Sequence, residues 1–269
     1  MIIEQPRDTI LILTPVKDAK LHLERYFALL SRLTYSRHLI SIALLESDSQ
    51  DGTYSALQAR LPGLQATYSF AQLFRKHFGF RLPPGVPRWA QEIQIQRRAI
   101  LARSRNQLMI RALSDQDWVL WLDVDVIDYQ PDVVERLLAT RKEIVQPHCV
   151  LTYGGKTYDR NGWWDRGRVH LNDLRGEGDL VKLHAVGGTM LLIKADIHRD
   201  GLVFPPFLYG KENPLIRENN GLVRSRDKHL LLEGASRGEI ETEGLGIMAH
   251  DMGYECWGMP NLEIRHFNG

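Results

Sequence analysis

Short apolar runs alternate with amphipathic segments through the first half of the chain, and this alternation constrains the fold more than any other feature. The runs that predict strands are Thr9–Thr14, Leu39–Leu45, a weaker one at Ala66–Phe70, and Trp118–Leu122. The segments that predict helices lie at Leu23–Leu33, Thr53–Leu61 and Arg97–Leu113. Strands that alternate with helices pair in parallel and are covered by those helices, so the sequence predicts an open α/β sheet.

The rest of the chain is less regular. Arg81–Trp89 is rich in proline, which predicts a surface loop. After Pro147 the pattern is irregular until a glycine-hinged strand at Ala185–Asp196, and a short helix is predicted at Thr242–Met252. Gly210–Gly238 is long, charged and poorly periodic, so it is either a functional lid or a disordered segment.

Composition excludes several classes of protein. The 269 residues are 43% hydrophobic, enough for one large domain or two fused halves. A formal net charge of +1 disfavours binding to nucleic acid or to acidic membranes through bulk charge. Cys149 and Cys256 are too few for a disulfide framework and lack the spacing of a zinc site. Neither a signal peptide nor the roughly 18 apolar residues of a membrane span is visible, so the chain as written is expected to be soluble.

The predicted strand Trp118–Leu122 leads directly into two acids, Asp123 and Asp125. On a strand these two side chains share one face, where their charges repel each other unless a cation or hydrogen-bond donors compensate. A hard divalent metal ion meets that need and also binds substrate phosphates. Ligands of open α/β sheets bind at the carboxyl ends of strands, where these acids stand. The alternative is that Asp123 and Asp125 form a solvated acidic turn together with Asp128.

The predicted helix before that strand is rich in arginine, a residue suited to phosphate or ribose oxygens. Its arginines are Arg97, Arg98, Arg103 and Arg105. Most of them are expected on the solvated face of the helix, and we single out Arg105 with its neighbour Asn106 as candidates for binding a ligand. A basic patch for nucleic acid is the third interpretation, and the near-zero net charge disfavours it.

The second predicted strand also ends in acids, in the stretch ESDSQDGT. Asp48 is placed to accept hydrogen bonds from a base or a ribose, as the acid of dinucleotide-binding folds does. Alternatively, Asp48 and Asp51 form an Asx turn and cap the next helix. The first strand is followed by TPVKDA rather than by a glycine-rich loop, which disfavours a Rossmann dehydrogenase or a P-loop enzyme.

A set of motifs resembles one known family. The stretches ILILTPVKDA, ESDSQDGT, ARSRNQLM, WLDVDV, VGGTMLLIKADIHRDGLVFPPF, ETEGLGIMAHDMGY and GMPNLEIRH occur in the family's order over nearly the whole chain. Together they resemble the fungal Golgi α-mannosyltransferases of the mannan polymerase complexes, which form family 62 of the glycosyltransferases.

The resemblance implies a GT-A glycosyltransferase fold. This is an α/β fold with a single Rossmann-like mixed sheet flanked by helices, here with a nucleotide-sugar half at about 1–127 and an acceptor half at 128–269. The implied reaction is metal-dependent transfer of mannose from GDP-mannose, with retention, to a mannoside or another glycan, with Mn²⁺ or another divalent cation as cofactor. Homo- or hetero-oligomers are implied as well. Family members are Golgi-luminal with an N-terminal anchor, which this chain lacks; if complete, it is expected in the cytoplasm.

The resemblance also implies roles for individual residues. Asp125 is expected to ligate the metal directly, while Asp123 reaches the ribose or a metal-bound water and counts among the metal, donor and catalytic residues. His266 matches the family's C-terminal metal-ligating histidine; from the residues alone it is one of ten histidines, at the end of a short strand. The residues expected at the donor are Thr14, Pro15, Lys17, Asp48, Arg105, Asn106, Asp123, Gly187 and Gly188.

Four further residues have two interpretations each. Glu241 and Glu243 are expected near the sugar and the acceptor as catalytic acids, or they place favourable charge at a helix N-terminus. Gly187 and Gly188 allow close approach of the backbone to the substrate, or they form a simple turn.

Other interpretations concern aromatic residues and the function as a whole. Trp163 and Trp164 stack on a sugar ring, or they anchor the core. A nucleotidyltransferase that makes nucleotide sugars also uses aspartates at strand ends, although it needs a glycine-rich loop that is missing here. A non-catalytic scaffold subunit that binds the donor weakly is the third functional class.

Overall fold

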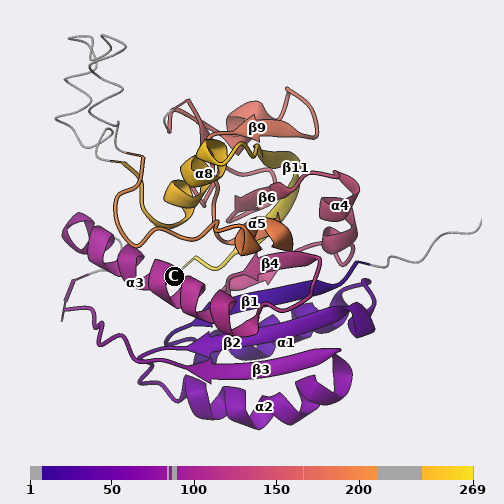
Figure 1. The fold of residues 1–269 in the computed structure, drawn as a ribbon, viewed down its shortest axis with the longest axis vertical. Helices are drawn as coiled ribbons and strands as arrows, with labels where there is room; N and C mark the ends of the chain where they lie inside the picture. The colour runs from indigo at the N-terminus through magenta and orange to yellow at the C-terminus, as the bar shows by residue number, and fades with distance from the viewer. Residues whose placement is uncertain (1–7, 84, 87–89, 166, 211–237, 269) are drawn as a thin grey trace, which may run out of the picture.

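The computed structural model describes residues 8–83, 85–86, 90–165, 167–210 and 238–268 (Figure 1). The Gly210–Gly238 segment lies almost wholly outside these ranges, and so do parts of the proline-rich Arg81–Trp89 segment. Neither prediction is tested.

The elements of the first half are β1 (Ile10–Val16), α1 (Lys20–Arg32), the 3₁₀ turn η1 (Arg37–Leu39), β2 (Ile40–Glu46), α2 (Thr53–Thr67), β3 (Phe70–Arg75), α3 (Gln91–Ala112) and β4 (Trp118–Leu122). Those that follow are β5 (Val126–Asp128), α4 (Val133–Ala139), β6 (Ile144–Val150), β7 (Trp163–Trp164), β8 (Val169–His170), the 3₁₀ turn η2 (Leu171–Leu174), β9 (Val181–Leu183), β10 (Met190–Lys194), α5 (Ala195–Arg199), α8 (Glu241–Asp251) and β11 (Cys256–His266).

Within the described residues, nine strands form one mixed sheet in the order β3-β2-β1-β4-β10-β6-β11-β5, with β9 paired to β11. The strands β3, β2, β1 and β4 are parallel, as the alternation of strands and helices predicts. Strand β10 runs antiparallel to both of its neighbours, β4 and β6. The apolar strand β4 therefore lies in the interior of the sheet, and its carboxyl end opens where the sheet changes from parallel to antiparallel pairing.

Helices cover both faces of the sheet (Figure 1). Side chains of α1, α2 and α4 pack with Ile12, Ile42 and Leu120 on one face. Side chains of α3, α5 and α8 pack with Leu13 and Trp121 on the other. Neighbouring residues of one strand thus enter different cores, because successive side chains of a strand point to opposite faces. This two-sided burial explains why the central strands are continuous apolar runs.

Several sequence-based boundaries are wrong. Of the glycine-hinged strand predicted at Ala185–Asp196, only Met190–Lys194 is a strand, and Ala195 begins α5. The third strand is Phe70–Arg75 rather than Ala66–Phe70, because α2 continues through Pro62 to Thr67 and buries Leu64. Helix α3 begins at Gln91, before Arg97. In these cases tertiary packing outweighs the local signals on which the boundaries were placed.

The chain around Pro147 is also more regular than its sequence indicates. All of β6, Ile144–Val150, is a buried strand that contains Pro147, so it shows no polar alternation. The proline lacks an N–H for the ladder, and its pairing with β11 is irregular just beyond Met259, the partner of Pro147. No helix in the described part of the chain is both long and apolar enough to cross a membrane. The division of the sheet into two functional halves near residue 127 stays a prediction.

Candidate functional site

The paired acids lie in the turn that joins β4 to β5. Strand β4 ends at Leu122, so the prediction that Asp123 and Asp125 share a face of a strand is wrong. The backbone N–H of Asp123 donates to the carbonyl of Thr189 at 2.9 Å, and the N–H of Phe267 donates to the carbonyl of Asp125 at 3.0 Å. These bonds hold the turn between the start of β10 and the end of the chain.

Both acids line a cavity of ≈ 480 Å³ at this edge of the sheet. Its wall comes from α3, the β4–β5 turn, a segment before β7, the turn before β10, the start of α8 and the end of β11. The lining residues are Gln94, Arg97, Arg98, Leu101, Arg105, Asp123, Asp125, Tyr158, Asp159, Arg160, Asn161, Gly188, Thr189, Glu241, Thr242 and His266.

Two of the predicted metal ligands meet in this cavity. His266 Nε2 lies 3.0 Å from Asp125 Oδ1, while His266 Nδ1 donates to the carbonyl of Phe267 at 2.6 Å. Burial opposes protonation of His266, but hydrogen bonding to Asp125 raises its pKa. The backbone carbonyl holds the proton on Nδ1, so Nε2 is the nitrogen that faces the carboxylate and is free to ligate a metal ion once it loses its own proton.

The third predicted ligand, Asp123, is held differently. Burial raises the pKa of Asp123 to about 6, although the Arg105 guanidinium lowers it. At neutral pH this carboxyl is still mostly ionised, but its raised pKa shows that the nearby positive charge does not fully offset burial and the charge of Asp125, and a bound cation would favour the ionised form. No set of three metal-ligating side chains is found in the described ranges, so a cation held by Asp125 and His266 would need its other ligands from substrate or water. These residues fit a divalent cation.

Arg105 is the central cation of the cavity wall. It is 1% exposed, and its Nη2 lies 3.0 Å from Asp123 Oδ1 and 3.3 Å from the Gly188 carbonyl. Its Nε lies 3.0 Å from Glu241 Oε1, off the direction of a hydrogen bond. Among the described residues, Arg105 Nη1 and Glu241 Oε1 are buried without a hydrogen-bond partner. Buried polar atoms of this kind are rare, and here they show that the ion pair between Arg105 and Glu241 lacks good hydrogen-bond geometry.

Arg98 stands beside Arg105 and fixes the start of α8. Its Nη1 lies 2.7 Å from Glu243 Oε2, and its Nη2 donates to the carbonyl of Ile240 at 2.6 Å. Trp163 donates its indole N–H to Glu243 at 2.8 Å. Trp163 is thus a buried anchor. Glu243 is held by the side chains of Arg98 and Trp163 and does not line the cavity, whereas Glu241 does.

The structure separates the other predicted residues of α3. Arg97 lines the cavity together with Arg98 and Arg105, so the prediction that most of the four arginines lie on the solvated face is wrong. Of the four, Arg103 alone is exposed, on the outer side of the helix. The amide of Asn106 is occupied by the backbone of Phe204, to which it donates at 2.7 Å and from which it accepts at 2.9 Å. Asn106 is not among the residues that line the cavity.

A second cavity of ≈ 270 Å³ adjoins the first, because Arg97 and Leu101 line both. Its other lining residues come from the end of β1, the end of β2, the loop after β3 and α3. They are Pro15, Val16, Lys17, Asp18, Ser47, Phe80, Leu82, Ile100 and Ser104. The predicted donor residues Pro15 and Lys17 thus lie at one opening, whereas Thr14 is buried and bonds the hydroxyl of Tyr26 at 2.7 Å.

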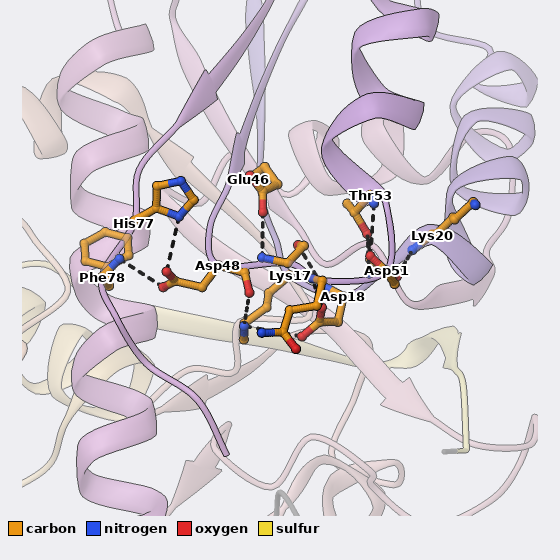
Figure 2. A network of polar contacts seen from close by, with 12 residues as sticks. Lys17, Asp18, Lys20, Glu46, Asp48, Asp51, Thr53, His77 and Phe78 are labelled. Atoms are coloured by element: carbon orange, nitrogen blue, oxygen red, sulfur yellow. Dashed lines mark hydrogen bonds and ion pairs between the residues drawn. The ribbon is translucent and has the colours of Figure 1, made fainter. Parts of the chain in front are cut away.

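Asp48 organises the loop that forms one wall of the second cavity. Figure 2 shows its carboxylate turned toward His77 and the backbone of Phe78, while Lys17 donates to its carbonyl at 2.8 Å. Burial tends to raise the pKa of Asp48, but hydrogen bonds from the N–H groups of Phe78, Gly79 and Phe80 outweigh it and lower the pKa. Asp51, as the alternative interpretation expects, bonds Thr53 at the start of α2.

Comparisons with known proteins identify the family and the fold of this chain. The Anp1 family model matches residues 3–171 and 165–208, which is most of the chain. The chain belongs to the Anp1 family. It is 27% identical to the mannan polymerase II complex anp1 subunit of Schizosaccharomyces pombe, over 97% of this chain and 64% of that protein. It is 26% identical to the mannan polymerase complex subunit MNN9 of Candida albicans, over 97% of this chain and 75% of that protein. The chain thus spans less than two thirds of the first of these relatives.

The fold of this Anp1-family chain is GT-A. A mannosyltransferase from Pyrobaculum calidifontis, solved in complex with GDP-Man and Mn²⁺, superposes with a TM-score of 0.58 at 15% identity, over 97% of this chain and 57% of that one. GalNAc-T7 with UDP, GalNAc and Mn²⁺ superposes with a TM-score of 0.55 at 16% identity, over 97% and 44% of the two chains. The predicted fold class and the family resemblance are both confirmed.

The two predicted glycines serve close packing of the cavity wall. A Cβ on Gly188 would lie 2.6 Å from Thr242 Cγ2 and 2.7 Å from Arg105 Nη2, and Gly188 lines the cavity. A Cβ on Gly187 would collide with the Asp159 carboxylate. The turn therefore requires glycine because side chains of the protein itself approach it closely. This requirement does not depend on whether a ligand also approaches the turn.

Sequence reasoning missed the segment Tyr158–Asn161, all of which lines the cavity. Asp159 Oδ2 accepts hydrogen bonds from the N–H of Thr189 at 3.2 Å and from its hydroxyl at 2.8 Å, which attaches the segment to the turn before β10. Its only local signal is a polar and aromatic composition, in the irregular part of the chain after Pro147. Its contribution became visible once the fold placed it opposite the paired acids.

Proposed function

We propose that this chain is a metal-dependent glycosyltransferase that transfers mannose from GDP-mannose, with retention, to a mannoside or another glycan acceptor. The observation that carries the proposal is the contact between Asp125 and His266, which come from distant parts of the sequence and meet beside the buried Arg105. The family and the GT-A fold support it, as do the relatives named as mannan polymerase subunits and the neighbour solved with GDP-Man and Mn²⁺.

The charges of the cavity suit a metal–diphosphate pair. Four arginines and four carboxylates line it, so their formal charges cancel. A divalent cation and the diphosphate of a nucleotide sugar also cancel, so the two bind together without leaving net charge in a partly buried site. The cation would be held by Asp125 and His266, and when bound it would stabilise negative charge on the leaving diphosphate.

The remaining steps belong to the chain's own side chains. Arg105 and Arg98 are positioned to stabilise negative charge that grows on the diphosphate as the sugar–phosphate bond breaks. The second cavity, with Pro15, Lys17 and Ser104, is proposed to hold the nucleoside. Asp48 acts there by fixing the neighbouring loop, and Thr14 and Asn106 support the site through the contacts described above.

Three acids are proposed near the reacting sugar. Glu241 lines the cavity and is the first candidate to contact the sugar or the acceptor. Glu243, two residues further along α8 and outside the cavity lining, acts through Arg98. Asp123, paired with Arg105, faces the metal and the ribose.

A thermal-shift panel tests the proposal, with GDP, UDP and GDP-mannose each measured with and without Mn²⁺, followed by assays of donor hydrolysis and of transfer to mannosides. GDP with Mn²⁺ is expected to stabilise the protein by more than either alone, because binding stabilises by mass action. Asp125→Ala is expected to abolish this synergy, and Asp196→Ala, whose side chain is 66% exposed, serves as the matched control. Stabilisation by UDP instead of GDP would refute the donor assignment.

A non-catalytic role remains the second candidate because the relatives are named as subunits of complexes. This alternative predicts the same binding of GDP and Mn²⁺ with no hydrolysis and no transfer. The non-catalytic role requires assembly with an active partner subunit. The proposed transferase could also assemble with such a partner.

A further inference from the structure

Tyr158 has a contact that the proposed reaction does not account for. Its ring stacks on the imidazole of His266, with 4.3 Å between ring centroids and 27° between the planes. Both side chains line the cavity. We propose that Tyr158 is a positioning residue that holds the His266 imidazole in its metal-binding orientation, an inference that rests on the proposed metal site.

The imidazole is restrained on its edges by two other groups. Phe267 accepts the hydrogen bond from Nδ1, and Asp125 faces Nε2. These contacts fix which nitrogen points to the metal, but hydrogen bonds in the ring plane resist tilting of the ring only weakly. A ring packed on the face of the imidazole supplies the missing restraint, and such supporting contacts around a metal ligand tune metal affinity.

The backbone around Tyr158 is fixed by hydrogen bonds, as a positioning residue requires. Its backbone N–H donates to the carbonyl of Cys149, at the end of β6, at 2.8 Å. The residue before it, Thr157, donates its hydroxyl to Asn172 at 2.7 Å and contacts His148 Nε2 at 2.8 Å. The residue after it, Asp159, is bonded to Thr189. Strand β6 lies beside β11, which carries His266, so the tyrosine and the histidine are set by neighbouring strands.

The experiment measures Mn²⁺ affinity directly, from the loss of the free-ion EPR signal during titration, with and without saturating GDP. Tyr158→Ala is expected to weaken Mn²⁺ binding by about tenfold or more, and Tyr158→Phe, which keeps the ring, is expected to stay within about twofold of the parent. Tyr153→Ala removes an exposed tyrosine that does not line the cavity and is the matched control.

A double-mutant cycle separates positioning from general loss of structure. If Tyr158 acts through His266, then Tyr158→Ala has little further effect on Mn²⁺ affinity in a His266→Ala background, where Asp125 and the diphosphate still bind the ion. An equal loss in both backgrounds would overturn the inference, as would unchanged affinity in Tyr158→Ala. Absence of Mn²⁺ binding by the parent protein, with or without GDP, would instead refute the proposed metal site itself.

Discussion

Replacing Arg105 by methionine is expected to destabilise the protein strongly. The methionine has a similar length, but it leaves Asp123 and Glu241 without the guanidinium that lies 3.0 Å from each of them. Glu241 is 3% exposed, so it cannot recover its hydration, and Arg98 at 3.9 Å is its nearest remaining cation. Removing one partner of a buried ion pair costs about 3–5 kcal/mol, out of roughly 5–15 kcal/mol for a whole domain.

The cost is expected to depend on pH in a defined direction. In the variant, Asp123 loses the guanidinium that lowers its pKa, so its folded-state pKa rises further above its unfolded value and the folded protein binds the extra proton. The stability deficit is therefore smallest near pH 4.5 and grows as pH rises toward 7.5. Because one pKa unit corresponds to about 1.4 kcal/mol, the deficit at pH 7.5 exceeds that at pH 5 by at least about 1 kcal/mol.

Urea unfolding at several pH values, with EDTA present to remove metal, measures this deficit. In thermal unfolding at pH 7.5 the Tm is expected to fall by about 10 °C, given roughly 2–4 °C per kcal/mol for a chain of this size. Arg103→Met is the matched control, since Arg103 lies on the same helix and is exposed, and its effect is expected to stay within about 0.5 kcal/mol. A deficit for Arg105→Met that is no larger than this, or that does not change with pH, would refute the buried-network argument.

Two further predictions concern single side chains. Ser104 is 3% exposed, lines the second cavity, and its hydroxyl has no hydrogen-bond partner in the described structure. Ser104→Ala is therefore expected to leave stability unchanged but to weaken GDP binding by about three- to tenfold in calorimetric titration. The exposed Ser55→Ala is the control, and unchanged GDP affinity in Ser104→Ala would remove Ser104 from the nucleoside site. Burial lowers the pKa of His198 to about 4, and its Nε2 accepts the Trp121 indole N–H at 3.2 Å, so the folded state resists protonation. Stability is then lost as pH falls from about 6.5 toward 4, by about 2 kcal/mol at pH 5, and this part of the acid sensitivity should disappear in His198→Gln; equal slopes for both proteins would contradict it.

The candidate site could be predicted in part from sequence. The paired acids at the end of an apolar strand mark an exposed strand end in a buried sheet, and that signal is local. His266 carries no such signal and was identified by family resemblance. Tyr158 and Asp159 carried neither signal, because their segment becomes part of the site only through its packing against β10 and β11.

The sequence by itself determined the strands β1, β2 and β4, the helices between them and the chemistry available at their ends, because the periodicity of apolar residues is a local property of the chain. Tertiary structure decided which of those groups reach a ligand. Arg103 and Arg105 are two residues apart, about 200° around a helix, so the docking of α3 on the sheet exposes one and buries the other. Likewise, Asp48 and Asn106 have suitable side chains for a ligand, but the folded loops beside them take up their hydrogen bonds.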